Sequence, residues 1–142
     1  MKHKGKITIC EILSIMGFMV MSISFLLMPF VDNSGGVNVY SITVGLMFWI
    51  GFLMGIIMQI VSVNTCKDKN KDYRIGLCSF MKNIYGIIAD CVVVVSIVIF
   101  IIGMVVTNQT GYICFFGIAL FTFSFCMHCV CNGRVFRCIL SK

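Results

Sequence analysis

Four polar side chains stand inside long apolar stretches of the sequence, and their types could support chemistry there. They are Glu11, Gln59, Asp90 and His128. Each stands within a few residues of one end of its stretch, so the rise of about 1.5 Å per helical residue puts all four at a similar depth. Ionisable groups in hydrocarbon are costly and by default indicate function. The set predicts an inner polar layer, either a structural network of interhelical hydrogen bonds or a proton or ion site. The alternative is that these are unrelated side chains that reach the membrane interface.

The four stretches that must position these side chains cover residues 7–30, 40–63, 84–106 and 112–131. Each reaches the roughly 20 residues that a membrane-spanning helix needs. The composition is 60% hydrophobic and 11% charged, against about 25% charged in soluble domains. A water-soluble core and a disordered chain are both excluded. The sequence predicts an all-α integral membrane protein, a four-transmembrane-helix bundle that forms one domain over residues 1–142.

Basic residues are divided unevenly between the connecting segments. All 11 Lys and Arg precede the first stretch, lie in the segment 64–83, or follow the fourth stretch, while 31–39 and 107–111 contain none. Positive charge collects on the cytoplasmic side of membrane proteins. We therefore expect a multi-pass protein, in the plasma or cell membrane, with both termini and the basic loop 64–83 in the cytoplasm. The net charge of +6 then suits anionic lipid headgroups, and no nucleic-acid partner is expected.

The C-terminal segment, residues 132–142, is predicted to be a short interfacial helix. Its apolar side chains share one helical face and its two arginines lie on the other. Such an amphipathic segment lies in the plane of the membrane surface.

Cysteines are abundant, and three of them flank His128. Thiolate and imidazole ligands suit zinc, and Cys-x-x-Cys also suits redox exchange. The expected topology places seven of the nine cysteines at the cytoplasmic edge, where thiols stay reduced. We therefore expect no metal and no cofactor, and interpret them as small hydrophobic residues or, in a eukaryote, S-palmitoylation sites. The weak metal candidates are Cys126, His128, Cys129 and Cys131.

The second stretch carries the small-residue spacing Gly51-x-x-x-Gly55. Glycines four residues apart let two helix backbones approach closely. This pattern predicts that the face with Gly51 and Gly55 packs against a neighbouring helix.

The length and the four expected helices are similar to those of the small multidrug-resistance exporters. That resemblance implies a carboxylate in the first helix, where Glu11 stands here, but the residues around it and the long 64–83 loop depart from the family. We expect a non-enzymatic subunit, immunity-type or scaffold protein that acts on a membrane partner, or on its own copies, through helix contacts. The alternative is a small oligomeric proton-coupled transporter that uses Glu11 and Asp90. A membrane thiol-redox enzyme is the least favoured reading.

Overall fold

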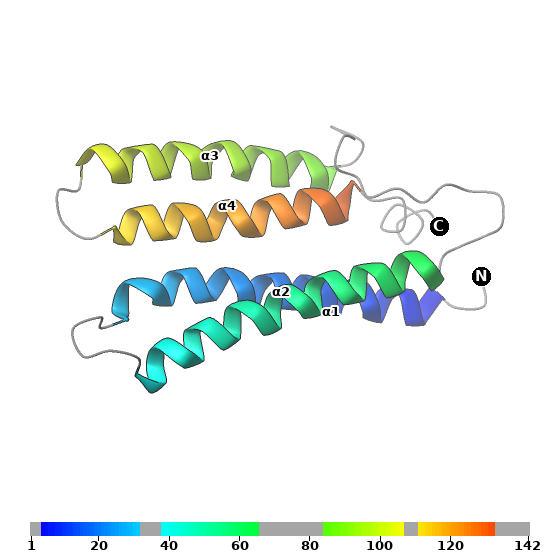
Figure 1. Cartoon of the computed structure of the whole chain (residues 1–142). Helices are drawn as coiled ribbons and strands as arrows, with labels where there is room; N and C mark the ends of the chain where they lie inside the picture. Colours follow the sequence, from blue (N-terminus) through cyan, green and yellow to red (C-terminus); the bar gives the residue numbers. More distant parts are fainter. Residues whose placement is uncertain (1–3, 32–37, 66–83, 107–110, 133–142) are drawn as a thin grey trace.

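The structure is a computed structural model that describes residues 4–31, 38–65, 84–106 and 111–132, and its regular elements there are all helical (Figure 1). Four of the helices in these residues have the length and apolar composition needed to cross a membrane. The predicted all-helical fold with four helices of spanning length is therefore confirmed. The elements are α1 (Lys4–Leu27), the 3₁₀ turn η1 (Met28–Phe30), α2 (Val39–Thr65), α3 (Ile84–Val106) and α4 (Tyr112–Cys131).

The bounds of two helices differ slightly from the sequence prediction. Helix α1 begins and ends three residues earlier than expected, and α2 begins one residue earlier and ends two residues later, whereas α3 and α4 have the expected bounds. Most of the predicted basic loop, 66–83, and nearly all of the predicted interfacial segment, 133–142, lie outside the described residues.

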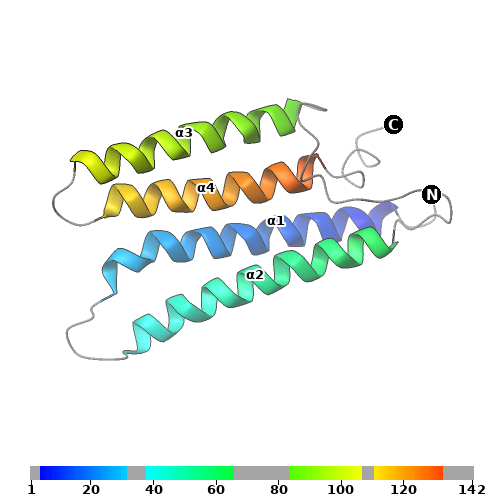
Figure 2. The same ribbon diagram turned by 45° about the horizontal axis from the view of Figure 1, so that its top comes forward.

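The helices form a row in the order α2, α1, α4, α3. Helix α1 packs on α2, α3 packs on α4, and the contact between α1 and α4 joins the two hairpins. Figure 2 shows α2 and α3 at opposite edges of this row, whereas α2 crosses α1 in the view of Figure 1. Only α1 and α4 therefore have a helix on both sides, so the arrangement is more open than a closed four-helix bundle. We call the end where α1 and α3 begin the polar end, and the opposite end the far end.

Local sequence signals explain where the first hairpin turns at the far end. Pro29 lies in η1, and because its ring cannot continue an α-helix, α1 ends just before it. Helix α2 begins with a reciprocal cap, in which Ser41 N–H donates to Asn38 Oδ1 at 2.8 Å and Asn38 N–H donates to Ser41 Oγ at 3.2 Å. Such a cap satisfies backbone donors that the first helical turn leaves without partners.

Glycines bring the backbones of α1 and α2 into direct contact. A Cβ atom on Gly51 would lie 2.6 Å from the Gly17 carbonyl oxygen, and one on Gly17 would lie 2.6 Å from the Gly55 nitrogen. Ser14 Oγ crosses the same seam and donates to the Gly55 carbonyl oxygen at 2.8 Å. The structure thus places Gly51 and Gly55 against α1, and it shows Gly17 as the opposing glycine.

The seam between α3 and α4 also depends on small residues. A Cβ atom on Gly117 would lie 2.9 Å from the Phe100 nitrogen, and one on Gly103 would lie 2.9 Å from the Cys114 nitrogen. Both contacts are with backbone of the opposite helix. The two hairpins are therefore built in the same way, with glycines setting the distance between the helices.

Small polar side chains make up much of the interior, beside an apolar cluster of Phe18, Met21 and Val130, whereas the outer faces are apolar. Ser14, Ser24, Ser62 and Ser96 are fully buried. Large aliphatic side chains point outward instead, with Val94 62% exposed and many Ile and Leu residues beside it on the outer faces. A water-soluble fold has the opposite distribution, with large hydrophobic residues inside.

Candidate functional site

Glu11 is the centre of the polar contacts between α1 and α2. Its side chain is 3% exposed. Ser62 Oγ donates to Glu11 Oε1 at 2.5 Å, and Gln59 Nε2 donates to Glu11 Oε2 at 2.7 Å. Gln59 and Ser62 stand three residues apart, on one face of α2, so both reach the same carboxyl group. The carboxyl group is thus held by two neutral donors from the adjacent helix.

A second polar cluster joins α3 to α4. His128 is 5% exposed, and its Nδ1 atom pairs with Asp90 Oδ1 across the seam. The amide nitrogen of Asn132, one turn further along the chain, lies 3.0 Å from the same ring nitrogen. A proton on Nδ1 can be donated to Asp90 and not to the Asn132 nitrogen, because a carboxylate oxygen accepts hydrogen bonds and an amide nitrogen only donates them. The pair therefore acts as a polar clasp between the two helices.

Two buried oxygens of this second cluster lack a hydrogen-bond donor among the described residues. Within the described part of the chain, Asp90 Oδ2 and Asn132 Oδ1 are buried and accept no hydrogen bond. Asn132 is 1% exposed, and its Oδ1 atom lies 2.5 Å from the position that a Cβ atom on Gly86 would take. The absence of a side chain at Gly86 is what lets Asn132 pack against the start of α3.

The four residues predicted to form one layer therefore lie in two pairs, one in each hairpin. Glu11 pairs with Gln59, and Asp90 pairs with His128. The link between the pairs comes from the end of α4, where the buried thiol of Cys131 interacts electrostatically with the Glu11 carboxyl group. The polar atoms thus follow the helix order α2, α1, α4, α3 across the polar end.

The cysteines around His128 point to different neighbours. Cys126 and Cys129 line a groove beside α2, Cys131 lies within electrostatic range of Glu11, and His128 pairs with Asp90. Among the described residues, no three His, Cys, Asp or Glu side chains are grouped so that they could hold a metal ion. Four neighbouring positions on one helix cover more than one face, which is why adjacency in sequence does not bring these four ligand types to one point.

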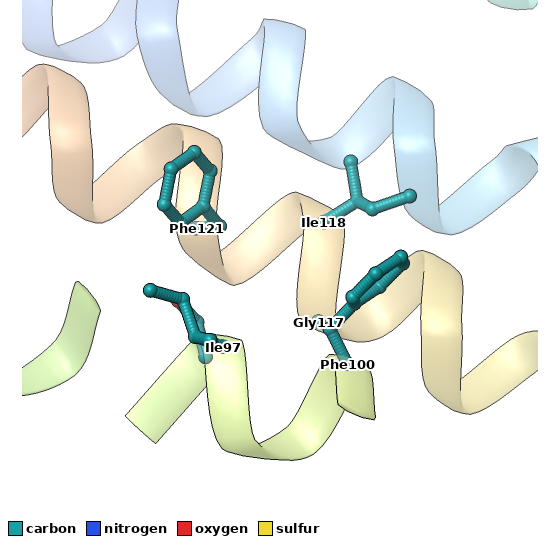
Figure 3. Close-up of a pocket in the computed structure, with 6 residues that line it drawn as sticks. Ile97, Phe100, Gly117, Ile118 and Phe121 are labelled. Carbon is teal, nitrogen blue, oxygen red and sulfur yellow. The ribbon is translucent and has the colours of Figure 1, made fainter. Parts of the chain in front are cut away.

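A pocket of about 230 Å³ lies between α3 and α4, away from both polar clusters. Figure 3 shows Phe100 of α3 and Phe121 of α4 among the side chains around it. The remaining lining residues are Ser96, Ile97, Gly117 and Ile118. The hydroxyl group of Ser96 donates to the Val93 carbonyl oxygen of its own helix at 2.6 Å. This pocket is a packing gap beside Gly117 and offers no group for catalysis.

Sequence reasoning missed three members of the site: Ser62, Cys131 as a neighbour of Glu11, and Asn132. The spacing of Gln59 and Ser62 was a usable signal, because residues three apart share a helical face. Asn132 follows the last helical residue, where a polar residue reads as an ordinary helix end. The chain matches no known family model, no curated protein sequence and no solved structure, so its function has to be argued from this geometry.

Proposed function

We propose that the chain is a multi-pass membrane protein, with both termini and the loop 64–83 in the cytoplasm, that acts without catalysis on a membrane partner through helix contacts. Insertion is supported by the four spanning-length helices. It is also supported by the buried serines and the exposed aliphatic side chains, because helices in lipid pack through small and polar residues. The orientation is supported by the 11 Lys and Arg, all in segments that adjoin the polar end.

The orientation is tested by cysteine labelling of intact cells with a membrane-impermeant reagent. Asn33→Cys and Gln109→Cys should each gain label over the parent protein, because both positions lie in segments without Lys or Arg. Lys69→Cys should gain none until the membrane is permeabilised. Labelling of Lys69→Cys in intact cells would overturn the proposed orientation.

The partner role rests on one observation: the polar side chains of the helices bond to one another inside each hairpin, and the outer faces are apolar. Glu11, Gln59 and Ser62 bond to one another across one seam, and Asp90 and His128 pair across the other. The outer faces of α2 and α3 are apolar, with Ile50 60% exposed and Ile101 53% exposed. Polar groups thus fix the fold, and broad apolar faces remain for contacts with other helices.

The partner role is tested by photo-crosslinking from the two edge helices. A photoreactive residue at Ile50 or Ile101 should give one discrete protein adduct, either a second copy or another membrane protein. The same residue at Val106, at the far end of α3, serves as the control and should give less of that adduct. A ladder of unrelated adducts, or none from either edge, would argue against a specific partner.

A second candidate function is proton-coupled transport, and one observation favours it. Glu11 is a buried carboxyl group that accepts hydrogen bonds from two neutral donors, and ionisable side chains inside a membrane span by default mark ion or proton pathways. The pockets between the helices are lined mainly by apolar side chains. This lining favours the partner role over a path for solute.

The amide variants Glu11→Gln and Asp90→Asn separate the two functions. Each variant keeps hydrogen-bonding capacity and removes a titratable proton. For a partner protein, Glu11→Gln should cost only about 0.6 kcal/mol, the average for an interhelical hydrogen bond in a membrane. For a transporter, decay of an imposed pH gradient in proteoliposomes should be faster than in empty liposomes and should return to the empty-liposome rate in either variant. Parent-dependent decay that the variants abolish would replace the partner role with transport.

A further inference from the structure

A groove of about 460 Å³ runs along one side of α1. Helices α2 and α4 supply its walls, and Phe18 of α1 contributes to its floor. Its lining is apolar apart from the amide of Gln59 and the thiols of Cys126 and Cys129. This volume is within the range of about 300–1,000 Å³ that is typical of small-molecule sites, which are mostly apolar with a few polar groups.

The length of the groove matches one leaflet of a membrane. On α2 it runs from Phe52 to Val63, which is about 16 Å at 1.5 Å per residue. Half of a hydrocarbon core of about 30 Å is close to the same length. Phe52 is the middle residue of α2, and Val63 lies two residues before its end. The groove therefore extends from the polar end to the middle of the span, as a lipid acyl chain does.

An acyl chain suits the chemistry of this lining. Lipid tails are as apolar as the side chains that line the groove, so a bound chain would be held by van der Waals packing along its length. A helix of a second copy is the other occupant that such a groove could take, and the experiment below distinguishes the two.

The charge around the open end favours an anionic headgroup. Lys6 in α1 is exposed near the polar end, and the other Lys and Arg flank the helices at that end in the sequence. Basic residues at the cytoplasmic surface attract anionic lipids. The Gln59 amide, which lines the groove and donates to Glu11, also has a second N–H and an oxygen with which to meet polar atoms of a lipid.

We propose that this groove binds one acyl chain of an anionic glycerophospholipid, with the headgroup at the polar end. The site requires membrane insertion but does not depend on a partner role. A bound lipid would cover α1 between α2 and α4 and would support the contact between the two hairpins. It would also connect the Glu11 cluster to the composition of the surrounding membrane through Gln59.

The test uses the purified full-length chain in detergent, titrated with phosphatidylglycerol or with phosphatidylcholine of the same acyl chains and followed by native mass spectrometry. Ile60→Trp should fill the groove, because Ile60 lines it, and Ile57→Trp is the control, because Ile57 does not. The two isoleucines are matched in exposure, at 53% and 50%. The parent and Ile57→Trp should bind one phosphatidylglycerol in preference to phosphatidylcholine. Ile60→Trp should bind it at least about tenfold more weakly, a loss of about 1.4 kcal/mol, because the indole would occupy the space of the chain.

A photoreactive acyl chain gives a second readout on the unaltered protein. A phosphatidylglycerol with a diazirine in its chain should label residues 52–63 and 125–130 more than the outer face of α3. Even labelling of all exposed faces, equal binding of the two lipids, or binding unaffected by Ile60→Trp would overturn the proposal. Lipid-free dimers that Ile60→Trp disrupts would also overturn it in favour of a second copy. Failure of the partner role alone would leave a monomer that still binds phosphatidylglycerol.

Discussion

Gly51→Ala is expected to destabilise the α1–α2 hairpin by about 1–3 kcal/mol, the usual cost of an overpacked interior. The added Cβ atom would lie 2.6 Å from both the Gly17 carbonyl oxygen and the Met21 nitrogen. Both atoms belong to the backbone of α1, so no side chain can rotate away and the two helices must separate. Separation would also stretch the bond from Ser14 to the Gly55 carbonyl, because it crosses the same seam.

The matched control is Gly45→Ala on the same helix. A Cβ atom there would have no neighbour within 4 Å, and alanine is favoured over glycine in a helix by up to about 1 kcal/mol. The two substitutions therefore have opposite expected signs. Gly55→Ala should fall between them, because its Cβ atom would meet the ring of Phe18, a side chain that can move. Reversible unfolding in mixed micelles measures all three, and equal effects at Gly51 and Gly45 would show that the close approach is not needed.

Most of the helical fold could be predicted from the sequence, because a chain that is expected to enter a bilayer has few possible backbone structures. Every backbone N–H in hydrocarbon needs a partner within its own segment, so a helix was expected for the four-valine run at 92–95 despite its preference for strands in water. The structure has this run in α3. Length then sets the bounds to within a few residues. The depth of Glu11, Gln59, Asp90 and His128 also follows from counting residues along each helix.

The depth of these four side chains in their helices does not determine which of them form pairs. Helices joined by short connections are usually neighbours, and the pairs Glu11 with Gln59 and Asp90 with His128 follow that rule. The contact between α1 and α4, which brings Cys131 to Glu11, depends on how each helix is rotated about its axis. The hydrophobic pattern did not specify that rotation, because apolar residues surround every helix and leave only a weak amphipathic face.

The clasp between α3 and α4 is expected to show the second large effect. His128→Leu removes the partner of Asp90 and leaves a partly buried carboxyl group, whose other oxygen is buried and already lacks a hydrogen bond among the described residues. Leaving a buried polar group unsatisfied costs about 1–3 kcal/mol. Asp90→Leu should cost a similar amount, since it leaves His128 facing an apolar side chain across the seam. Replacing both partners should cost less than the sum of the two single changes, because neither Asp90 nor His128 then faces an apolar side chain across the seam.

A double-mutant cycle measures this difference directly. Unfolding free energies of the parent, His128→Leu, Asp90→Leu and the double variant should give a coupling of about 0.5–3 kcal/mol, the range for residues in contact. The control cycle pairs Asp90→Leu with Ser14→Ala, whose hydroxyl group bonds within the other hairpin. Those two changes should add to within about 0.5 kcal/mol. A His128–Asp90 coupling no larger than that of the control would mean that glycine packing holds α3 to α4 and that the polar pair is free for another use, such as the binding of a proton.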